Sequence, residues 1–114
     1  MPFLLLKTNI TLDKTMSAAM LNNASTVIAR TTGKPESYIM VNVCDSQHLI
    51  MGGKPNPAVY MEFKSVEMPQ EQVKQLVEAL TKMVVDRMKV PPNRVYIEFS
   101  SVPGCMWGYN NSTF

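Results

Sequence analysis

The chain contains an internal repeat, in which the pattern of the first half recurs 57 positions further along. Each half runs in the same order through an apolar strand-like segment, a helical segment of about 18 residues, a proline and a second strand-like segment. The identical pairs are Lys7 and Lys64, Val27 and Val84, Arg30 and Arg87, and Pro35 and Pro92. Because the order of the patterns agrees as well as these identities, we expect two copies of one supersecondary unit.

The spacing of apolar residues assigns the elements of each unit. Apolar residues recur at i, i+3 and i+4 through both helical segments, which is the pattern of an amphipathic helix. Asp13 is a candidate N-cap and Gly33 a candidate stop for the first helix, and Pro69 suits the first turn of the second. The expected strands are residues 3–8, 38–43, 59–65 and 95–99.

A strand, a helix and a strand in one unit form a βαβ motif with parallel strands. Two such units, at roughly 2–57 and 58–114, predict an α/β fold of the α+β sandwich type. It would be one domain over residues 1–114, with a four-stranded mixed sheet and both helices on one face. The other face has no cover, and the strands are rich in Leu, Val, Ile and Phe. We therefore expect an obligate oligomer, a closed ring that packs this face inward.

Charge and hydropathy exclude several classes of protein. The formal charge is +2, from 11 basic and 9 acidic residues without a Lys/Arg run, which argues against nucleic-acid binding and against a polybasic membrane patch. No apolar run approaches the ~20 residues of a membrane span, and residues 3–6 are too few for a signal peptide. We expect synthesis in the cytoplasm and, for any export, a non-classical route.

The sulfur-containing residues give no metal or redox motif. Cys44 and Cys105 are far apart, with no Cys-x-x-Cys pair, and His48 is the only histidine, so we expect free, at least half-buried thiols and no metal or cofactor. Helically spaced methionines are expected to fill the core. They are Met16, Met20, Met83 and Met88.

Pro2 is the candidate catalytic residue. Loss of Met1 would leave Pro2 as a free secondary amine at the head of an apolar strand. An α-amino group titrates at about 7.7–8.0, and burial lowers that pKa, so the amine would be a base near working pH. The alternative is that Pro2 is simply a tolerated second residue.

Several short segments, in order along the whole chain, resemble those of one known family. They are Met1-Pro2, Thr8-Asn9, Gly33-Lys34-Pro35 with Tyr38-Ile39, Gly52-Gly53, Arg94-Val95-Tyr96-Ile97 and Asn110-Asn111-Ser112-Thr113-Phe114. With these, the chain resembles the macrophage migration inhibitory factor family of the tautomerase superfamily. The resemblance implies a homotrimer whose sheets line a central barrel. It also implies keto–enol tautomerisation of phenylpyruvate-like 2-oxo acids, dopachrome-type isomerisation, and often a secreted, cytokine-like role.

The resemblance also implies roles for individual residues. Pro2 matches the family's catalytic base, and Lys34 matches the lysine that binds the substrate carboxylate; a plain helix-end cation is the alternative for Lys34. Ser65 and Val66 match a strand-end pair whose backbone contacts the ligand. Tyr96 matches a pocket tyrosine contributed by the neighbouring subunit.

Other positions concern substrate choice. Glu98 stands where the family often has asparagine, and if it faced the site its charge would oppose a carboxylate. Aromatic residues would form walls that favour an aryl substrate, although ordinary packing is an equal alternative for each. They are Tyr38, Trp107, Tyr109 and Phe114. A Cys-x-x-Cys that some members carry is replaced by residues 58–61, which predicts no thiol–disulfide exchange.

Three functions follow from these observations. The first is a cofactor-free tautomerase that uses Pro2 and takes a small aromatic 2-oxo acid. The second is a secreted, receptor-binding homologue whose pocket is vestigial or weak. The third, a structural trimer without activity, applies if Met1 is retained, because an amide-linked proline cannot be a base.

Overall fold

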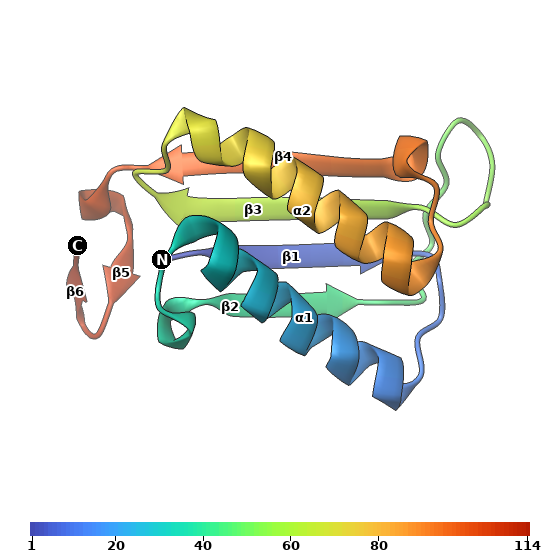
Figure 1. The fold of residues 1–114 in the computed structure, drawn as a ribbon, viewed down its shortest axis with the longest axis horizontal. Coiled ribbons are helices and arrows are strands. Elements are labelled where there is room, and N and C mark those ends of the chain that lie inside the picture. The colour runs from blue at the N-terminus through green and yellow to red at the C-terminus, as the bar shows by residue number, and fades with distance from the viewer.

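The computed structural model describes residues 1–114 as two layers, a four-stranded sheet and two helices on one of its faces (Figure 1). Its elements are β1 (Phe3–Thr8), α1 (Lys14–Thr32), η1 (Glu36–Tyr38), β2 (Met40–Cys44), β3 (Val59–Val66), α2 (Gln70–Met88), η2 (Pro92–Arg94), β4 (Val95–Val102), η3 (Gly104–Met106), β5 (Gly108–Tyr109) and β6 (Ser112–Thr113). The strand order is β2-β1-β3-β4, with β1–β2 and β3–β4 parallel and β1–β3 antiparallel. The mixed sheet of two βαβ units is therefore confirmed.

The ends of the helices follow from their flanking residues. The Met16 N–H donates to the Asp13 carboxylate at 2.7 Å, and Gly33 ends α1 in the left-handed conformation at φ 71°, so both predicted caps are confirmed. Pro69 was expected in the first turn of α2, but it occupies the N-cap instead, with extended backbone. At the N-cap, as in the first turn, the missing N–H of a proline costs the helix nothing, because the first N–H groups of a helix have no partner within it.

The second strand of the first unit begins later than its apolar pattern suggests. Tyr38 was expected in that strand, but it lies in η1, where its N–H donates to the Pro35 carbonyl at 3.1 Å. A 3₁₀ turn after the proline therefore delays β2 until Met40 and carries Tyr38 away from the sheet. In the second unit, β4 runs to Val102, beyond the expected end at residue 99.

The core lies between the helices and the covered face of the sheet. Alternate residues of β1 and β3 point into it, as the period of two along a strand requires. Its buried members are Leu4, Leu6, Met20, Ala24, Ile28, Val59, Met61, Phe63, Leu76, Leu80, Met83, Val84, Met88 and Val90. Three of the four named methionines are among them and Met16 packs against them, so their assignment to the core is confirmed.

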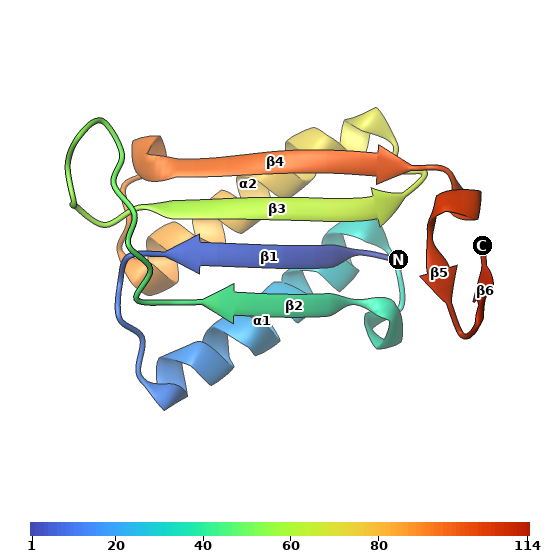
Figure 2. The same ribbon diagram turned by 180° about the vertical axis from the view of Figure 1, so that it is seen from behind.

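The helix-free face of the sheet is uncovered by any other element of the chain, as Figure 2 shows. Its side chains are mixed because residues alternate along each strand: Phe3, Leu5 and Met40 are apolar residues of this face, whereas charged side chains lie on it in β3 and β4. On this face the Tyr60 hydroxyl donates to the Glu62 carboxylate at 2.9 Å, and the Lys64 ammonium lies 3.6 Å from the same carboxylate. The face therefore exposes both apolar and charged side chains, and its packing against another subunit stays a prediction.

The long connection between β2 and β3 is held in place by two side chains. The Arg94 guanidinium donates to four loop carbonyls, those of Met51, Lys54, Asn56 and Pro57, at 2.9–3.2 Å. The Asn9 amide donates to the carbonyls of Leu49, Pro55 and Asn56. The loop projects from one end of the molecule, and the two chain termini lie together at the other (Figure 1).

Two further observations concern the surface. No helix has the length and apolar character needed to cross a membrane. Cys44 is half-buried, but Cys105 is exposed, so the prediction of at least half-buried thiols is wrong for Cys105. Its short 3₁₀ turn, η3, lies outside the two layers and has no buried residue.

Candidate active site

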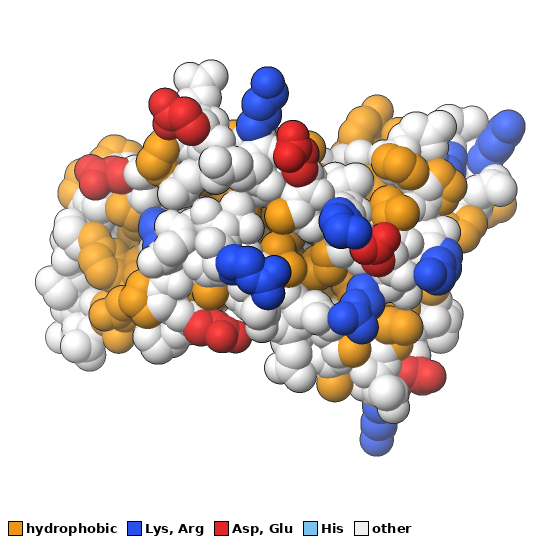
Figure 3. Space-filling model, in the orientation of Figure 1, with side chains coloured by type: hydrophobic (Ala, Val, Ile, Leu, Met, Phe, Trp, Pro, Cys, Tyr) orange, Lys and Arg blue, Asp and Glu red, His pale blue; other side chains and the backbone are white.

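A cavity of about 440 Å³ opens at the N-terminal end of β1, between η1 and the C-terminal β5–β6 hairpin. Seven of its ten lining residues are hydrophobic, which suits a ligand with an apolar body. They are Met1, Pro2, Phe3, Ser37, Tyr38, Ile39, Met40, Trp107, Gly108 and Tyr109. Hydrophobic side chains also gather on the surface at this hairpin end, whereas charged ones are spread over the helices (Figure 3).

Pro2 lies at the inner end of this cavity. Its side chain is fully buried, and its carbonyl accepts the Met40 N–H at 3.0 Å, which ties the start of the chain to β2. The free amine here is that of Met1. Burial, then hydrogen bonding by Lys34 and its positive charge, lowers the pKa of this amine from 8.0 to about 6.

Lys34 reaches the same end of the sheet from the residue after the α1 C-cap. Its ammonium donates to the Ser65 hydroxyl at 3.1 Å and to the Val66 carbonyl at 3.4 Å. Lys34, Ser65 and Val66 are therefore in contact beside the N-terminus, where the register of β1 with β3 also brings Pro2, although none of the three lines the cavity itself. Such a cluster pairs an amine of lowered pKa with a fixed positive charge, which is an arrangement for binding an anion and moving a proton.

Three aromatic rings pack together at one side of the cavity, and two of them line it. The Tyr38 and Tyr109 rings meet edge to face with centroids 5.5 Å apart, and Phe114 stacks on Tyr109 at 5.5 Å. Trp107 lines the cavity beside them. The predicted aromatic residues are thus gathered, with Phe114 behind Tyr109 rather than on the lining itself.

The remaining predicted residues, Tyr96 and Glu98, are not brought to the cavity of their own chain. Tyr96 is in register with Tyr60, which is in register with Lys7, five residues along β1 from Pro2. At ~3.3 Å per residue and ~4.8 Å per strand, Tyr96 lies about 19 Å from Pro2. By the same register, Glu98 lies about 14 Å away, on the helix-free face beside Glu62. Glu98 is exposed there.

The sequence did not reveal every residue of the site. Ile39 and Met40 line the cavity because the 3₁₀ turn bends this segment over the start of β1, and Ser65 contributes its side chain as well as its backbone. The turn could have been suspected from Pro35, which disfavours a direct entry into the strand. Nothing in the sequence pairs the Ser65 hydroxyl with Lys34, because they are 31 positions apart.

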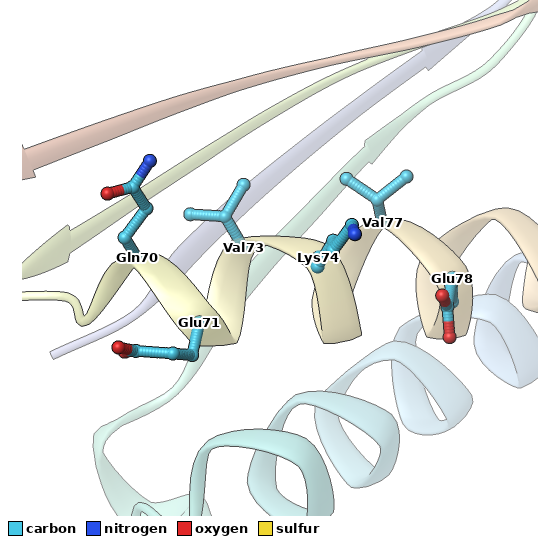
Figure 4. Close-up of a pocket in the computed structure, with 6 residues that line it drawn as sticks. All are labelled: Gln70, Glu71, Val73, Lys74, Val77 and Glu78. Atoms are coloured by element: carbon cyan, nitrogen blue, oxygen red, sulfur yellow. The ribbon is translucent and has the colours of Figure 1, made fainter.

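A larger hollow, of about 670 Å³, lies on the outer surface of α2 (Figure 4). All six lining residues come from one stretch of this helix, and in Figure 4 their side chains leave it in different directions. No second element supplies a group, so the hollow has no convergent chemistry. The structure also contains no group of three His, Cys, Asp or Glu side chains placed to hold a metal ion.

The fold and this cavity define a small α+β protein of two βαβ repeats, with an amine, a lysine and aromatic side chains gathered at the start of its first strand. The chain belongs to the macrophage migration inhibitory factor family, whose sequence model matches residues 1–114.

Individual relatives agree along the whole chain. A macrophage migration inhibitory factor homologue of Brugia malayi is 36% identical, over 100% of this chain and 99% of the relative. The solved homologue from Prochlorococcus marinus superposes with a TM-score of 0.91 at 26% identity, covering 98% of each chain. The structure from Trichinella spiralis gives a TM-score of 0.88 at 27% identity, covering 98% of this chain and 99% of that chain.

Proposed function

We propose that the protein is a cofactor-free phenylpyruvate tautomerase in which Pro2, freed by removal of Met1, is the general acid/base. The observation that carries the proposal is the environment of Pro2. Its side chain is buried, and burial together with the neighbouring Lys34 ammonium lowers the pKa of the adjacent Met1 amine. Removal of Met1 would move the free amine one residue further into this environment. The same burial and the same Lys34 charge would then keep the proline amine largely unprotonated at neutral pH.

The reaction needs only groups that the site supplies. The neutral proline amine takes a proton from the carbon next to the substrate carbonyl, and the electron pair of that C–H bond moves to form the enolate. The resulting proline ammonium then gives a proton to the enolate oxygen, which yields the enol and restores the base. Lys34 binds the substrate carboxylate, and the aromatic wall of Tyr38 and Tyr109 receives the phenyl ring.

The proposal includes assembly as a homotrimer. Tyr96 is 65% exposed and about 19 Å from its own Pro2, so it can serve a cavity only in a neighbouring subunit. The edge strands β2 and β4 also leave unpaired backbone groups that a neighbour can satisfy.

The first test is phenylpyruvate tautomerisation by protein whose mature N-terminus has been verified by intact mass. Pro2→Gly keeps an amine but loses the secondary amine and its fixed geometry, so we expect kcat/KM to fall by about 100-fold or more. For the wild type, kcat/KM should rise with pH through a midpoint below the usual range of an α-amine and level off above it, because burial and the Lys34 charge lower the pKa at this terminus and only the unprotonated amine is a base.

Lys64→Ala is the control, because Lys64 lies on the helix-free face and forms an exposed ion pair there. It should leave the pH midpoint unchanged. Full activity of Pro2→Gly, or no activity of correctly processed wild-type protein, would overturn the enzymatic proposal. The second outcome would favour the alternative, an extracellular receptor-binding role with a vestigial pocket. That alternative gains support from the family name that the relatives carry.

A further inference from the structure

We infer that Ser65 is a positioning residue: its hydroxyl holds the Lys34 ammonium beside the N-terminal amine, and so controls both carboxylate binding and the availability of the amine as a base. The inference deepens the proposed function and rests on it for the carboxylate part. The part that concerns the amine can be tested without any turnover.

The hydrogen bond joins an acceptor on a buried strand, the Ser65 hydroxyl, to a donor on a flexible side chain, the Lys34 ammonium. Ser65 is 1% exposed and lies within β3, where its backbone is in register with Ser101 of β4. Lys34 reaches it from a loop by a four-carbon stem, which can adopt many conformations. The 3.1 Å hydrogen bond from the Lys34 ammonium to the Ser65 hydroxyl therefore selects the conformation that points to the start of β1.

The acceptor orients Lys34 without cancelling its charge. The ion pairs of the protein are Lys64 with Glu62 and Lys82 with Asp86, and neither includes Lys34. A carboxylate in place of the Ser65 hydroxyl would neutralise the ammonium and compete with an anionic substrate. A hydroxyl and the Val66 carbonyl hold it by dipoles alone, so its full charge remains for a substrate and for the nearby amine.

The repeat provides an internal comparison. Thr8 is the repeat partner of Ser65, 57 positions earlier, and both end the row of buried side chains on the first strand of their unit. The Thr8 hydroxyl donates to the Ala58 carbonyl at 2.8 Å, a purely structural bond at the opposite end of the molecule from the cavity. The equivalent hydroxyl in the second unit instead accepts a hydrogen bond from the Lys34 ammonium, beside the N-terminal amine. The equivalent buried hydroxyls of the two halves, those of Thr8 and Ser65, thus have different roles.

The experiment measures the pH dependence of alkylation of the N-terminal amine by 3-bromopyruvate. The amine displaces bromide, forming a C–N bond and releasing a proton, and the product is quantified on the N-terminal peptide by mass spectrometry so that Cys105 does not interfere. Ser65→Ala should let Lys34 move into solvent. We expect its alkylation midpoint to rise by about half a pH unit or more, towards that of an ordinary α-amine.

In the tautomerase assay, Ser65→Ala should raise KM by about 10-fold with a smaller change in kcat, as expected when a hydrogen bond to a charged group is lost. Ser65→Thr keeps the hydroxyl and should restore both the midpoint and KM. Thr8→Ala is the matched control: it removes a buried hydroxyl too, but should leave the alkylation midpoint where it is.

An unchanged midpoint in a folded Ser65→Ala protein would overturn the inference. So would an equal shift in Thr8→Ala, because it would mean that loosening of the fold alone moves the midpoint. If the wild type fails to tautomerise phenylpyruvate but the midpoint still shifts in Ser65→Ala, the proposed reaction is wrong and the role of Ser65 at the amine stands.

Discussion

At the scale of single residues, the two helices end in the same left-handed conformation but with different residues at the C-cap. Gly33 ends α1 at φ 71°, and Lys89 ends α2 at φ 60°, so both occupy the left-handed region. A side chain there brings its Cβ close to the backbone, which costs about 1–2 kcal/mol, whereas glycine has no such cost. The backbone at Lys89 is therefore strained, whereas the backbone at Gly33 is not.

Lys89→Gly should for this reason stabilise the protein by about 0.5–1 kcal/mol, after allowance for the lost cation at the helix C-terminus. The measurement is the urea midpoint at one fixed protein concentration, since an oligomer unfolds in a concentration-dependent way. Lys89→Ala loses the cation without relieving the strain and should not be stabilised. A lower midpoint for Lys89→Gly than for the wild type would contradict this explanation.

The sequence allowed some residues of the candidate site to be predicted, but not all of their contacts. Pro2 and Lys34 could be predicted because each belongs to a short sequence motif, Met1-Pro2 for the first and Gly33-Lys34-Pro35 for the second. The hydrogen bond between Lys34 and Ser65 forms because the fold brings the α1 C-cap next to the end of β3. Sequence patterns do not show such a tertiary contact. The amine pKa depends on burial, and burial too is decided by packing.

At the scale of elements, the end of the C-terminal hairpin is held against η3 by one close backbone contact. The Phe114 N–H donates to the Gly104 carbonyl at 3.2 Å, and a Cβ on Gly104 would lie 2.7 Å from the Phe114 carbonyl oxygen. Only glycine permits this approach without displacing β6. The position of Phe114 behind Tyr109 thus depends on Gly104.

Gly104→Ala should displace the last strand and weaken the stack of Phe114 on Tyr109. We expect KM for phenylpyruvate to rise by about 3- to 10-fold, the equivalent of one lost aromatic contact. The KM for a 2-oxo acid without a ring, such as 2-oxobutyrate, should change little. Steady-state kinetics with both substrates gives the comparison, and Ser112→Ala is the control because Ser112 is an exposed residue of β6 that does not line the cavity. Equal loss with both substrates would show a general disturbance instead.

The order and type of the main elements were predictable because their periodicity is strong and repeated. Two features were not. The 3₁₀ turn of η1 is set by local hydrogen bonds after Pro35, and apolar spacing does not report such turns. The mixture of apolar and charged side chains on the helix-free face follows from which alternate residues face the helices, and composition alone does not show this alternation.

At the scale of the whole molecule, the distance between Tyr96 and Pro2 predicts that a working site is shared between subunits. A Pro2→Gly subunit and a Tyr96→Ala subunit should each form trimers of low activity. Mixed trimers should recover part of the activity, because some interfaces combine an intact Pro2 with an intact Tyr96. Subunits carrying both substitutions, mixed with Pro2→Gly subunits, should recover none.

The measurement is phenylpyruvate turnover after unfolding and refolding of the mixtures, with the trimer verified by sedimentation velocity. Recovery in the first mixture alone supports the shared site. No recovery in trimers shown to be mixed would mean that Tyr96 does not act across an interface.

The rigid loop between β2 and β3 has a practical consequence for anyone who handles this protein. A purification tag fused to either terminus would sit near the cavity, because Met1 lines it and Phe114 stacks on Tyr109, another lining residue. Both ends of the chain lie at the same end of the molecule (Figure 2). The Gly52-Gly53 turn lies at the far end, with both residues at positive φ and open space around them. An affinity peptide or a dye inserted at this turn would immobilise or report on the molecule with its cavity free and facing outward.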